Sequence, residues 1–209
     1  KSFFSMNSAR EERKEEKEKQ ANKEIQARKE AEKELVEFET LLTKEQDRHI
    51  ARFLTEQEVR ELKQNRLLVS LLIEVAGKPA DFIFKILKLM TINLKKERDV
   101  WLSHAILHEP KQINQQDKQL ELYTCFAEYE LVVQDLSRLI ELIFDYMPSS
   151  IEILEPALIK TEVSKINPLL NDLALKLHQY DRLLKQIQWE KNMLIKKMQE
   201  LKNTSNSEK

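Results

Sequence analysis

The chain has 209 residues, of which 34% are charged, and its 35 basic and 36 acidic side chains nearly cancel. Balanced charge does not create the one-signed field of a nucleic-acid binder, so we expect no nucleic-acid partner. The single glycine argues against the glycine-rich loops that cradle phosphates and dinucleotides.

The cysteine content and hydropathy bear on location. Cys125 is the single cysteine, so no internal disulfide can form, and the pattern favours a reducing, cytoplasmic compartment. We interpret Cys125 as a small buried residue of a strand. No run of 18 or more apolar residues exists, which predicts no membrane span. Because the chain begins with Lys1 and not with Met, we expect sequence upstream of it, where a signal or a membrane anchor stays open.

Residues 1–66 are predicted to form a charged helical arm. From Ala9 to Glu34 nearly every residue is Glu, Lys, Arg, Gln or Ala, with opposite charges four residues apart that support an exposed helix. Two Thr-x-x-Gln/Glu patterns, beginning at Thr43 and Thr55, fit the helix capping box. The helix therefore either breaks near Thr43 and restarts at Thr55, or continues to about Arg66. An apolar seam precedes these patterns, at Ala31, Leu35, Phe38 and Leu42.

Residues 67–156 contain two successive strand–helix–strand units, each ending at a Glu-Pro dipeptide. Two such units give the order βαββαβ of a ferredoxin-like fold, with both helices on one face of the sheet. The sequence thus predicts an α+β head between long helices. The expected elements are a strand at 67–76, a helix at 80–97, strands at 100–107 and 120–133, a helix at 136–146 and a strand at 150–154.

The C-terminal region is predicted to be a linker at 157–168, a coiled-coil helix at 169–203 and a disordered tail at 204–209. Its apolar residues recur at alternating spacings of three and four over more than four heptads, which indicates a coiled coil. The seam comprises Leu170, Leu173, Leu177, Tyr180, Leu184, Ile187, Lys191, Leu194, Met198 and Leu201.

The predicted topology suggests a partner for that seam. The first and last strands of a ferredoxin-like sheet are antiparallel neighbours, so both flanking helices should leave at one edge of the head. We therefore expect an antiparallel coiled-coil stalk within the chain, formed by residues 31–66 and the C-terminal helix. Pairing with a second chain is the alternative, because Lys191 at an a position is tolerated in parallel dimers. Both pairings in one assembly remain open.

The sheet face away from the helices is the predicted partner surface. Strict alternation gives this face acidic and apolar side chains without Lys or Arg, which argues against RNA. We expect a protein partner or a second copy there, although cover by the chain's own linker or helix stays open. The acidic members are Glu74, Glu128, Glu130 and Glu152. The predicted interface residues are Leu72, Trp101, Leu107, Phe126 and Leu154.

Two pairs of side chains could in principle form a catalytic or metal site. His104 and His108 would lie about 13 Å apart on a strand, too far to share an ion. Glu128 and Glu130 would lie about 6.6 Å apart, with no supporting histidine, metal cluster or glycine-lined pocket. We therefore predict no catalytic residue, no metal, no cofactor and no enzyme activity.

The turn at Gly77-Lys78-Pro79 lies between a strand and a helix. Free amides at the helix start, together with Lys78, could hold a small anion. The turn resembles the ligand turn of regulatory domains of the ACT type, which share the order βαββαβ. This resemblance implies an alternative function as a small-ligand sensor with a coiled-coil signalling stalk, beside the interpretation as a plain tight turn.

Several motifs resemble an uncharacterised, mainly archaeal family: Glu74-Val-Ala-Gly-Lys-Pro79, His108-Glu-Pro-Lys111, Phe126-Ala-Glu128, Tyr146-Met-Pro-Ser-Ser-Ile-Glu-Ile153 and Leu177-His-Gln-Tyr-Asp181. The resemblance covers residues 68–201. It implies an archaeal source and supplies no catalytic or ligand residues. From the residues themselves we predict a non-enzymatic scaffold or assembly protein that acts through protein–protein contacts of the sheet face and the coiled coil.

Overall fold

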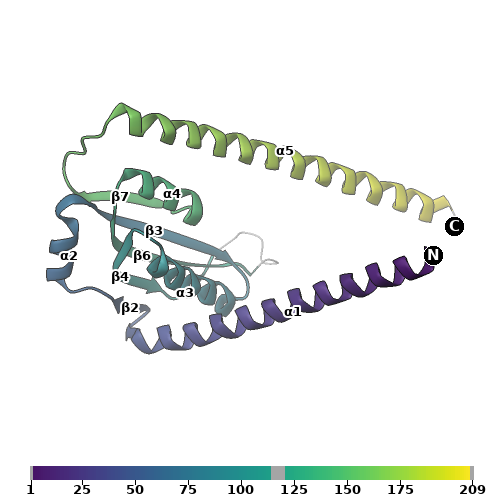
Figure 1. Ribbon diagram of the computed structural model, residues 1–209, viewed down its shortest axis with the longest axis horizontal. Coiled ribbons are helices and arrows are strands. Elements are labelled where there is room, and N and C mark those ends of the chain that lie inside the picture. Colours follow the sequence, from purple (N-terminus) through teal and green to yellow (C-terminus); the bar gives the residue numbers. More distant parts are fainter. Residues whose placement is uncertain (1, 114–120, 208–209) are drawn as a thin grey trace. The chain divides into compact units, whose positions relative to one another are not determined.

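The computed structural model describes residues 2–113 and 121–207, with side chains for residues 16–113 and 121–200. The chain divides into two units, Lys1–Leu158 and Ile159–Lys209. The first unit is α+β and the second is one helix (Figure 1). The elements are α1 (Ser2–Leu41), β1 (Thr43–Glu45), β2 (Arg48–Arg52), α2 (Glu56–Leu62), the 3-10 helix η1 (Lys63–Asn65), β3 (Leu67–Gly77), α3 (Ala80–Lys96), β4 (Val100–His108), β5 (Lys111–Gln112), β6 (Tyr123–Val133), α4 (Leu136–Tyr146), β7 (Ser150–Glu155) and α5 (Val163–Ser207).

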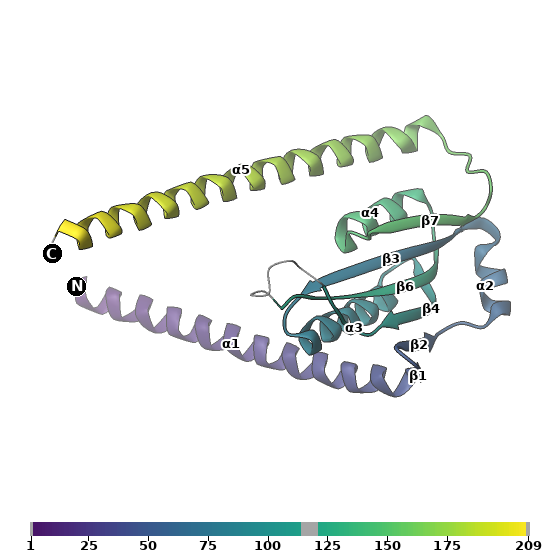
Figure 2. The ribbon, with the colours of Figure 1, turned by 180° about the vertical axis from the view of Figure 1, so that it is seen from behind.

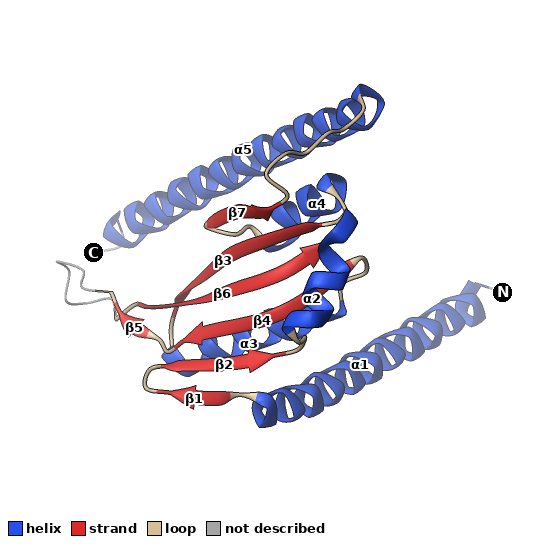
Figure 3. Ribbon diagram, turned by 90° about the vertical axis from the view of Figure 1, so that its left-hand side faces the viewer, coloured by secondary structure: helices blue, strands red, loops and turns tan. Residues whose placement is uncertain are grey.

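The strands form one antiparallel sheet in the order β1-β2-β4-β6-β3-β7, and β5 pairs with β6 beside this path (Figure 3). β3 and β6 pair without interruption from Leu67 opposite Val133 to Gly77 opposite Tyr123. β7 is the antiparallel neighbour of β3, as the sequence predicts. The predicted β6 start at Leu120 lies outside the described residues, and the strand is described from Tyr123.

The core lies between the sheet and helices α3 and α4, which cover the same face (Figure 3). α3 has apolar residues around much of its circumference, and Ile83, Leu87 and Leu94 are buried. α4 begins where the Asp135 carboxylate accepts a hydrogen bond from the Arg138 amide at 3.0 Å. The inward alternation of β3 and β6 is confirmed, because the following are all at most 1% exposed: Val69, Leu71, Ile73, Cys125, Ala127, Tyr129 and Leu131.

The N-terminal arm differs from the prediction, because α1 ends at Leu41 and a β-hairpin follows it. Thr43 begins a strand, so the predicted capping box there is wrong, while Thr55 caps α2 with the predicted box. The hairpin turn places Gln46 at φ 57°, a left-handed conformation for which the sequence offers no glycine. β2 joins the sheet beside β4 and buries Ala51 completely opposite Ala105.

The apolar seam of α1 packs on α3 (Figure 1, Figure 2). Phe38 is 4% exposed, and its ring stacks on Phe53 with a centroid separation of 6.4 Å. Lys88 of α3 pairs with Glu39 at 2.6 Å. The predicted stalk within the chain used residues 31–66 as its N-terminal arm, and the continuous helix considered for that arm is wrong because a β-hairpin lies between Thr43 and Arg52. Pairing of the C-terminal helix with another chain stays a prediction.

α5 runs from Val163 to Ser207 and contains Pro168 in its second turn. The helix therefore begins inside the predicted linker and extends through the predicted tail to Ser207, while residues 208–209 lie outside the description. Among the described residues, neither α5 nor any other helix is long and apolar enough to cross a membrane.

Candidate functional site

The outer face of the sheet, defined as the face opposite α3 and α4, is the first candidate surface, and a bulge in β4 decides its composition. The pairing of β4 with β6 shifts between Leu102 and His104. The carbonyl of the extra residue, Ser103, accepts hydrogen bonds from the amides of Phe53 and Leu54 at 2.8 and 3.2 Å. A bulge inserts one residue into a strand, so every later side chain changes face.

The bulge overturns one predicted interface residue. Leu107 was expected on the outer face with Trp101, but it lies opposite Ala127 and is fully buried. Trp101, before the bulge, lies opposite Val132 and is half-buried, with the Arg66 guanidinium 4.5 Å above its ring. The bulge could not be predicted from the sequence, because no glycine or proline near Ser103 indicates an irregularity in the strand.

The bulge also turns two histidines to the outer face, where each meets a glutamate of β6. His108 Nε2 lies 2.9 Å from Glu128 Oε1, and its ring stacks on Phe126 with centroids 4.0 Å apart. His104 Nδ1 lies 3.7 Å from Glu130 Oε1. Each histidine thus pairs with a different carboxylate. The described residues contain no group of three or more His, Cys, Asp or Glu that could hold a metal.

Basic residues reach the outer face from the hairpin, so the prediction of a face without Lys or Arg is wrong. Arg48 pairs in register with His108, and Arg52 pairs with His104. On the β6 side, Glu130 is in register with His104, whereas Glu128 is in register with Ile106 and reaches His108 through its side chain. We call these two groups of Glu, His and Arg the charged rows. Sequence reasoning missed both arginines because residues 43–52 were expected to be either a break between two helices or part of one helix, and not a strand.

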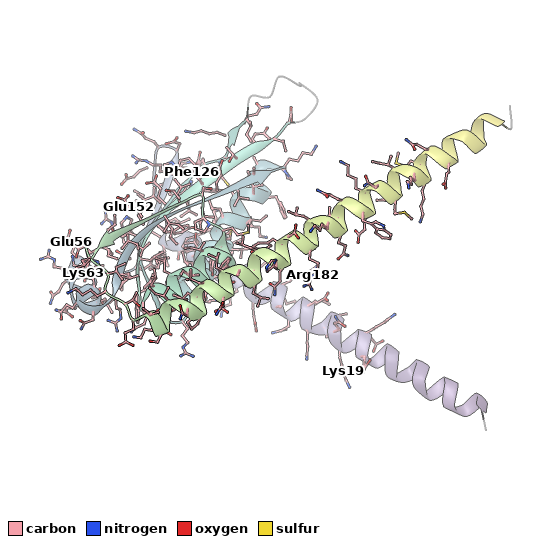
Figure 4. All side chains as sticks on the ribbon, turned by 90° about the horizontal axis from the view of Figure 1, so that it is seen from above. Lys19, Glu56, Lys63, Phe126, Glu152 and Arg182 are labelled. Carbon is pink, nitrogen blue, oxygen red and sulfur yellow. The ribbon has the colours of Figure 1, made fainter. Side chains whose placement is uncertain are left out.

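The remaining predicted interface residues lie on β6, β3 and β7. Leu72 and Phe126 are half-buried, and Leu154 is 39% exposed on β7, where the pairing of β7 with β3 shifts (Figure 4, in which Phe126 and Glu152 are labelled). Beside the rows, a hollow of about 640 Å³ lies between the start of α2 and the pair His104 and Glu130. The outer face therefore combines apolar area with charges of both signs, which suits a protein surface better than a polyanion.

At the turn predicted to hold an anion, the first turn of α3 forms ordinary helical hydrogen bonds, and the anion role of Gly77 and Lys78 stays a prediction. The amides of Phe82 and Ile83 donate to the Pro79 carbonyl at 3.1 and 3.3 Å. Asp81 adds an acidic side chain to the first turn of α3, where it disfavours an anion. A Cβ added at Gly77 would lie 3.1 Å from Ile83 Cγ2, so tight helix–strand packing explains the glycine.

Cys125 is 1% exposed, which confirms its interpretation as a buried strand residue. Burial, followed by the nearby Glu74 carboxylate, raises the pKa of its thiol to about 11. At neutral pH the group is therefore protonated and not nucleophilic.

α5 carries the second candidate surface. Every aliphatic seam residue with a described side chain is at least 40% exposed, and Leu177 and Leu184 are 57% and 59% exposed. Lys191 is exposed and Tyr180 is half-buried, while the side chain of Leu201 lies outside the described part. Two further exposed residues, Leu175 and Trp189, project from other positions of the helix and were not part of the predicted seam.

No curated protein and no solved structure matches the chain. One family model matches residues 68–206, the stretch from β3 into the last turns of α5. The match begins after α1, the hairpin and α2, and it agrees with the span of the motifs that the sequence shares with an archaeal family. The chain therefore belongs to the MJ0538 family, which is named for an archaeal uncharacterised protein and brings no activity with it.

Proposed function

We propose that this protein is a non-enzymatic assembly protein whose copies are joined through α5, while the outer face of the head receives a protein partner. The exposed seam of α5 carries the proposal. Apolar residues at alternating three- and four-residue spacing along a continuous helix form a stripe that is stable in water when another helix covers it.

The strand order supports a ferredoxin-like head. Two units, β3-α3-β4 and β6-α4-β7, contribute the order β4-β6-β3-β7, with both helices on one face. The hairpin extends this arrangement beyond β4 and adds Arg48 and Arg52 to the outer face. The head is thus a platform with a wide, mixed-charge face.

The side chains of the outer face support protein binding over catalysis. His104 and His108 each lie beside a separate glutamate of β6, at 3.7 and 2.9 Å, so each histidine has its own carboxylate partner. Apolar side chains between charged rows are typical of a protein interface, where the charges set orientation and partner choice.

Joining through α5 is tested with two full-length copies that carry different affinity tags and are produced together. We expect the tags to co-purify. The variant Leu177→Ser with Leu184→Ser should abolish co-purification, because it removes two apolar side chains from the middle of the seam. The control, Leu175→Ser with Trp189→Ser, removes two equally exposed apolar side chains of the same helix outside the seam and should co-purify normally. Copies that never co-purify, or that do so despite the seam changes, would contradict the proposal.

The outer face is tested with Trp101→Ser and Phe126→Ser in one chain. We expect this variant to keep the pairing of copies and to lose proteins that the wild-type chain binds from extracts of its native source. Mass spectrometry of both bound sets gives the comparison, and identical sets would count against this face. A thermal-shift screen with amino acids and nucleotides addresses the sensor alternative, since a ligand of the folded state raises the melting temperature.

A further inference from the structure

We infer that α5 pairs antiparallel with α5 of a second copy, so that Tyr180 of each chain lies against Lys191 of the other. The inference rests on the proposed function, because it presumes that α5 joins copies, and it adds the orientation and register of the pair. It names a specific occupant for the exposed seam, a second copy of this chain.

The seam is symmetric about its own middle. Its central members are Leu184 and Ile187, and its two members that are not aliphatic, Tyr180 and Lys191, each lie four residues outside them. A two-fold interface requires that if one residue contacts another, the reciprocal contact also forms. An antiparallel pair centred between the two middle residues meets this requirement with matched layers. The layers are Leu184 with Ile187, Tyr180 with Lys191, Leu177 with Leu194, and Leu173 with Met198.

The Tyr180–Lys191 layer gives both polar groups a suitable neighbour. Lysine lays its aliphatic stem along an apolar surface and keeps its ammonium group in water, and it is attracted to an aromatic face. Tyrosine offers an apolar ring with a polar tip. In a parallel pair in register, each a position faces the same a position and each d position the same d position, so Lys191 would lie against Lys191 and Tyr180 against Tyr180. Only the antiparallel arrangement avoids two like charges within the seam.

Charges beside the seam favour the parallel orientation weakly. A parallel pair would bring Lys176 near Asp181 of the other chain, whereas the antiparallel pair brings Lys176 near Lys197. Asp181, however, already pairs with Lys185 of its own helix at 2.7 Å. Exposed charge pairs contribute little and are screened by salt, so the contacts within the seam decide the orientation.

Disulfide trapping distinguishes the orientations. Two full-length chains with Cys125→Ala carry L177C and L194C separately, each with its own tag. We expect mild oxidation of the mixture to link the two differently tagged chains, while neither chain alone forms a disulfide-linked dimer. A parallel pair in register would instead link each variant to itself. Self-linking of either variant, or no link in the mixture, would overturn the inference.

A charge comparison at one position provides a second test. The antiparallel pair sets Y180E against Lys191 twice, as opposite charges, and sets Y180K against the same residue twice, as like charges. We expect the dissociation constant of the Y180E pair to be lower than that of the Y180K pair by about tenfold or more. In a parallel pair both variants create like-charge contacts, so equal constants would contradict the inference. If the tagged copies co-purify but these tests fail, the orientation is wrong and the proposed function stands; if the copies never co-purify, both fail.

Discussion

Ser103 occupies the one position where β4 and β6 lose their regular pairing, and its carbonyl binds two amides of the chain that follows β2. The extra residue lets Leu102, Ala105 and Leu107 all face the core, although strict alternation would put Leu102 on the other side from the latter two. One serine thereby sets which side chains of β4 lie on the outer face.

Deleting Ser103 should destabilise the head by about 3 kcal/mol or more, since restored alternation expels buried residues on one side of the deletion. Ser103→Ala keeps the extra residue and should cost about 1 kcal/mol or less. Urea unfolding followed by Trp101 fluorescence, in a Trp189→Phe background, measures both. A deletion as stable as the alanine variant would show that the bulge does not fix the register.

Because of Cys125, we expect the free energy of unfolding to fall at alkaline pH. Its folded-state pKa, about 11, lies above the ordinary value of 9.0, so the folded state retains the proton longer than the unfolded state. The thiol therefore contributes stability that is fully present below about pH 9 and is lost as the pH rises through 11. Burial raises the pKa values of Tyr129 and Tyr146 as well, so these side chains add a loss of stability that begins near pH 10.0.

Cys125→Ala should therefore flatten the fall of unfolding free energy between pH 9 and 11, whatever the variant costs at pH 8. Urea unfolding at several pH values gives the slope. If wild type and variant share one slope, the thiol does not titrate differently in the folded state.

At the scale of elements, Phe38 is the main apolar contact of α1 with the head. Its ring is 4% exposed and stacks on Phe53, while ion pairs from Glu34 and Glu39 to lysines of α3 surround it. Exposed ion pairs contribute little, so the aromatic contact should dominate the docking of α1.

Phe38→Ala should lower the unfolding free energy by about 3 kcal/mol, because it leaves a cavity between α1 and the head. The matched control on the same helix is Val36→Ala, whose side chain is 61% exposed and whose loss should change stability by no more than about 0.5 kcal/mol. Equal effects in urea unfolding would mean that α1 is not docked through Phe38.

The elements also show what could be predicted from the sequence. β3, α3, β6 and α4 were predicted because their apolar residues recur at the spacing typical of a buried strand or helix. Asp135 also marks the start of α4. The hairpin was missed because its strands are short, its turn uses Gln46 at positive φ, and half of the residues in its strands are charged. The errors at the outer face follow from that omission: without β2 there is no source for Arg48, and nothing predicts the bulge.

At the scale of the whole molecule, the family match covers β3 to α5, whereas α1, the hairpin and α2 lie outside it. The matched part contains both surfaces of the proposal, the β3–β4–β6 portion of the outer face and the seam of α5. The unmatched part adds Arg48 and Arg52 beside that face. We therefore expect Arg48→Ala with Arg52→Ala to change the set of proteins that the head binds, as mass spectrometry of the bound proteins would show. The same variant should leave the pairing of copies intact, as co-purification of tagged copies would show.

Sedimentation equilibrium of the full chain tests most directly whether copies assemble through α5. We predict a mass of about twice the 24.9 kDa chain at micromolar concentration. The mass should fall to that of one chain in the Leu177→Ser, Leu184→Ser variant and should not change in the Leu175→Ser, Trp189→Ser control. A wild-type chain that sediments as a single copy throughout this range, or a seam variant that keeps the doubled mass, would contradict the account.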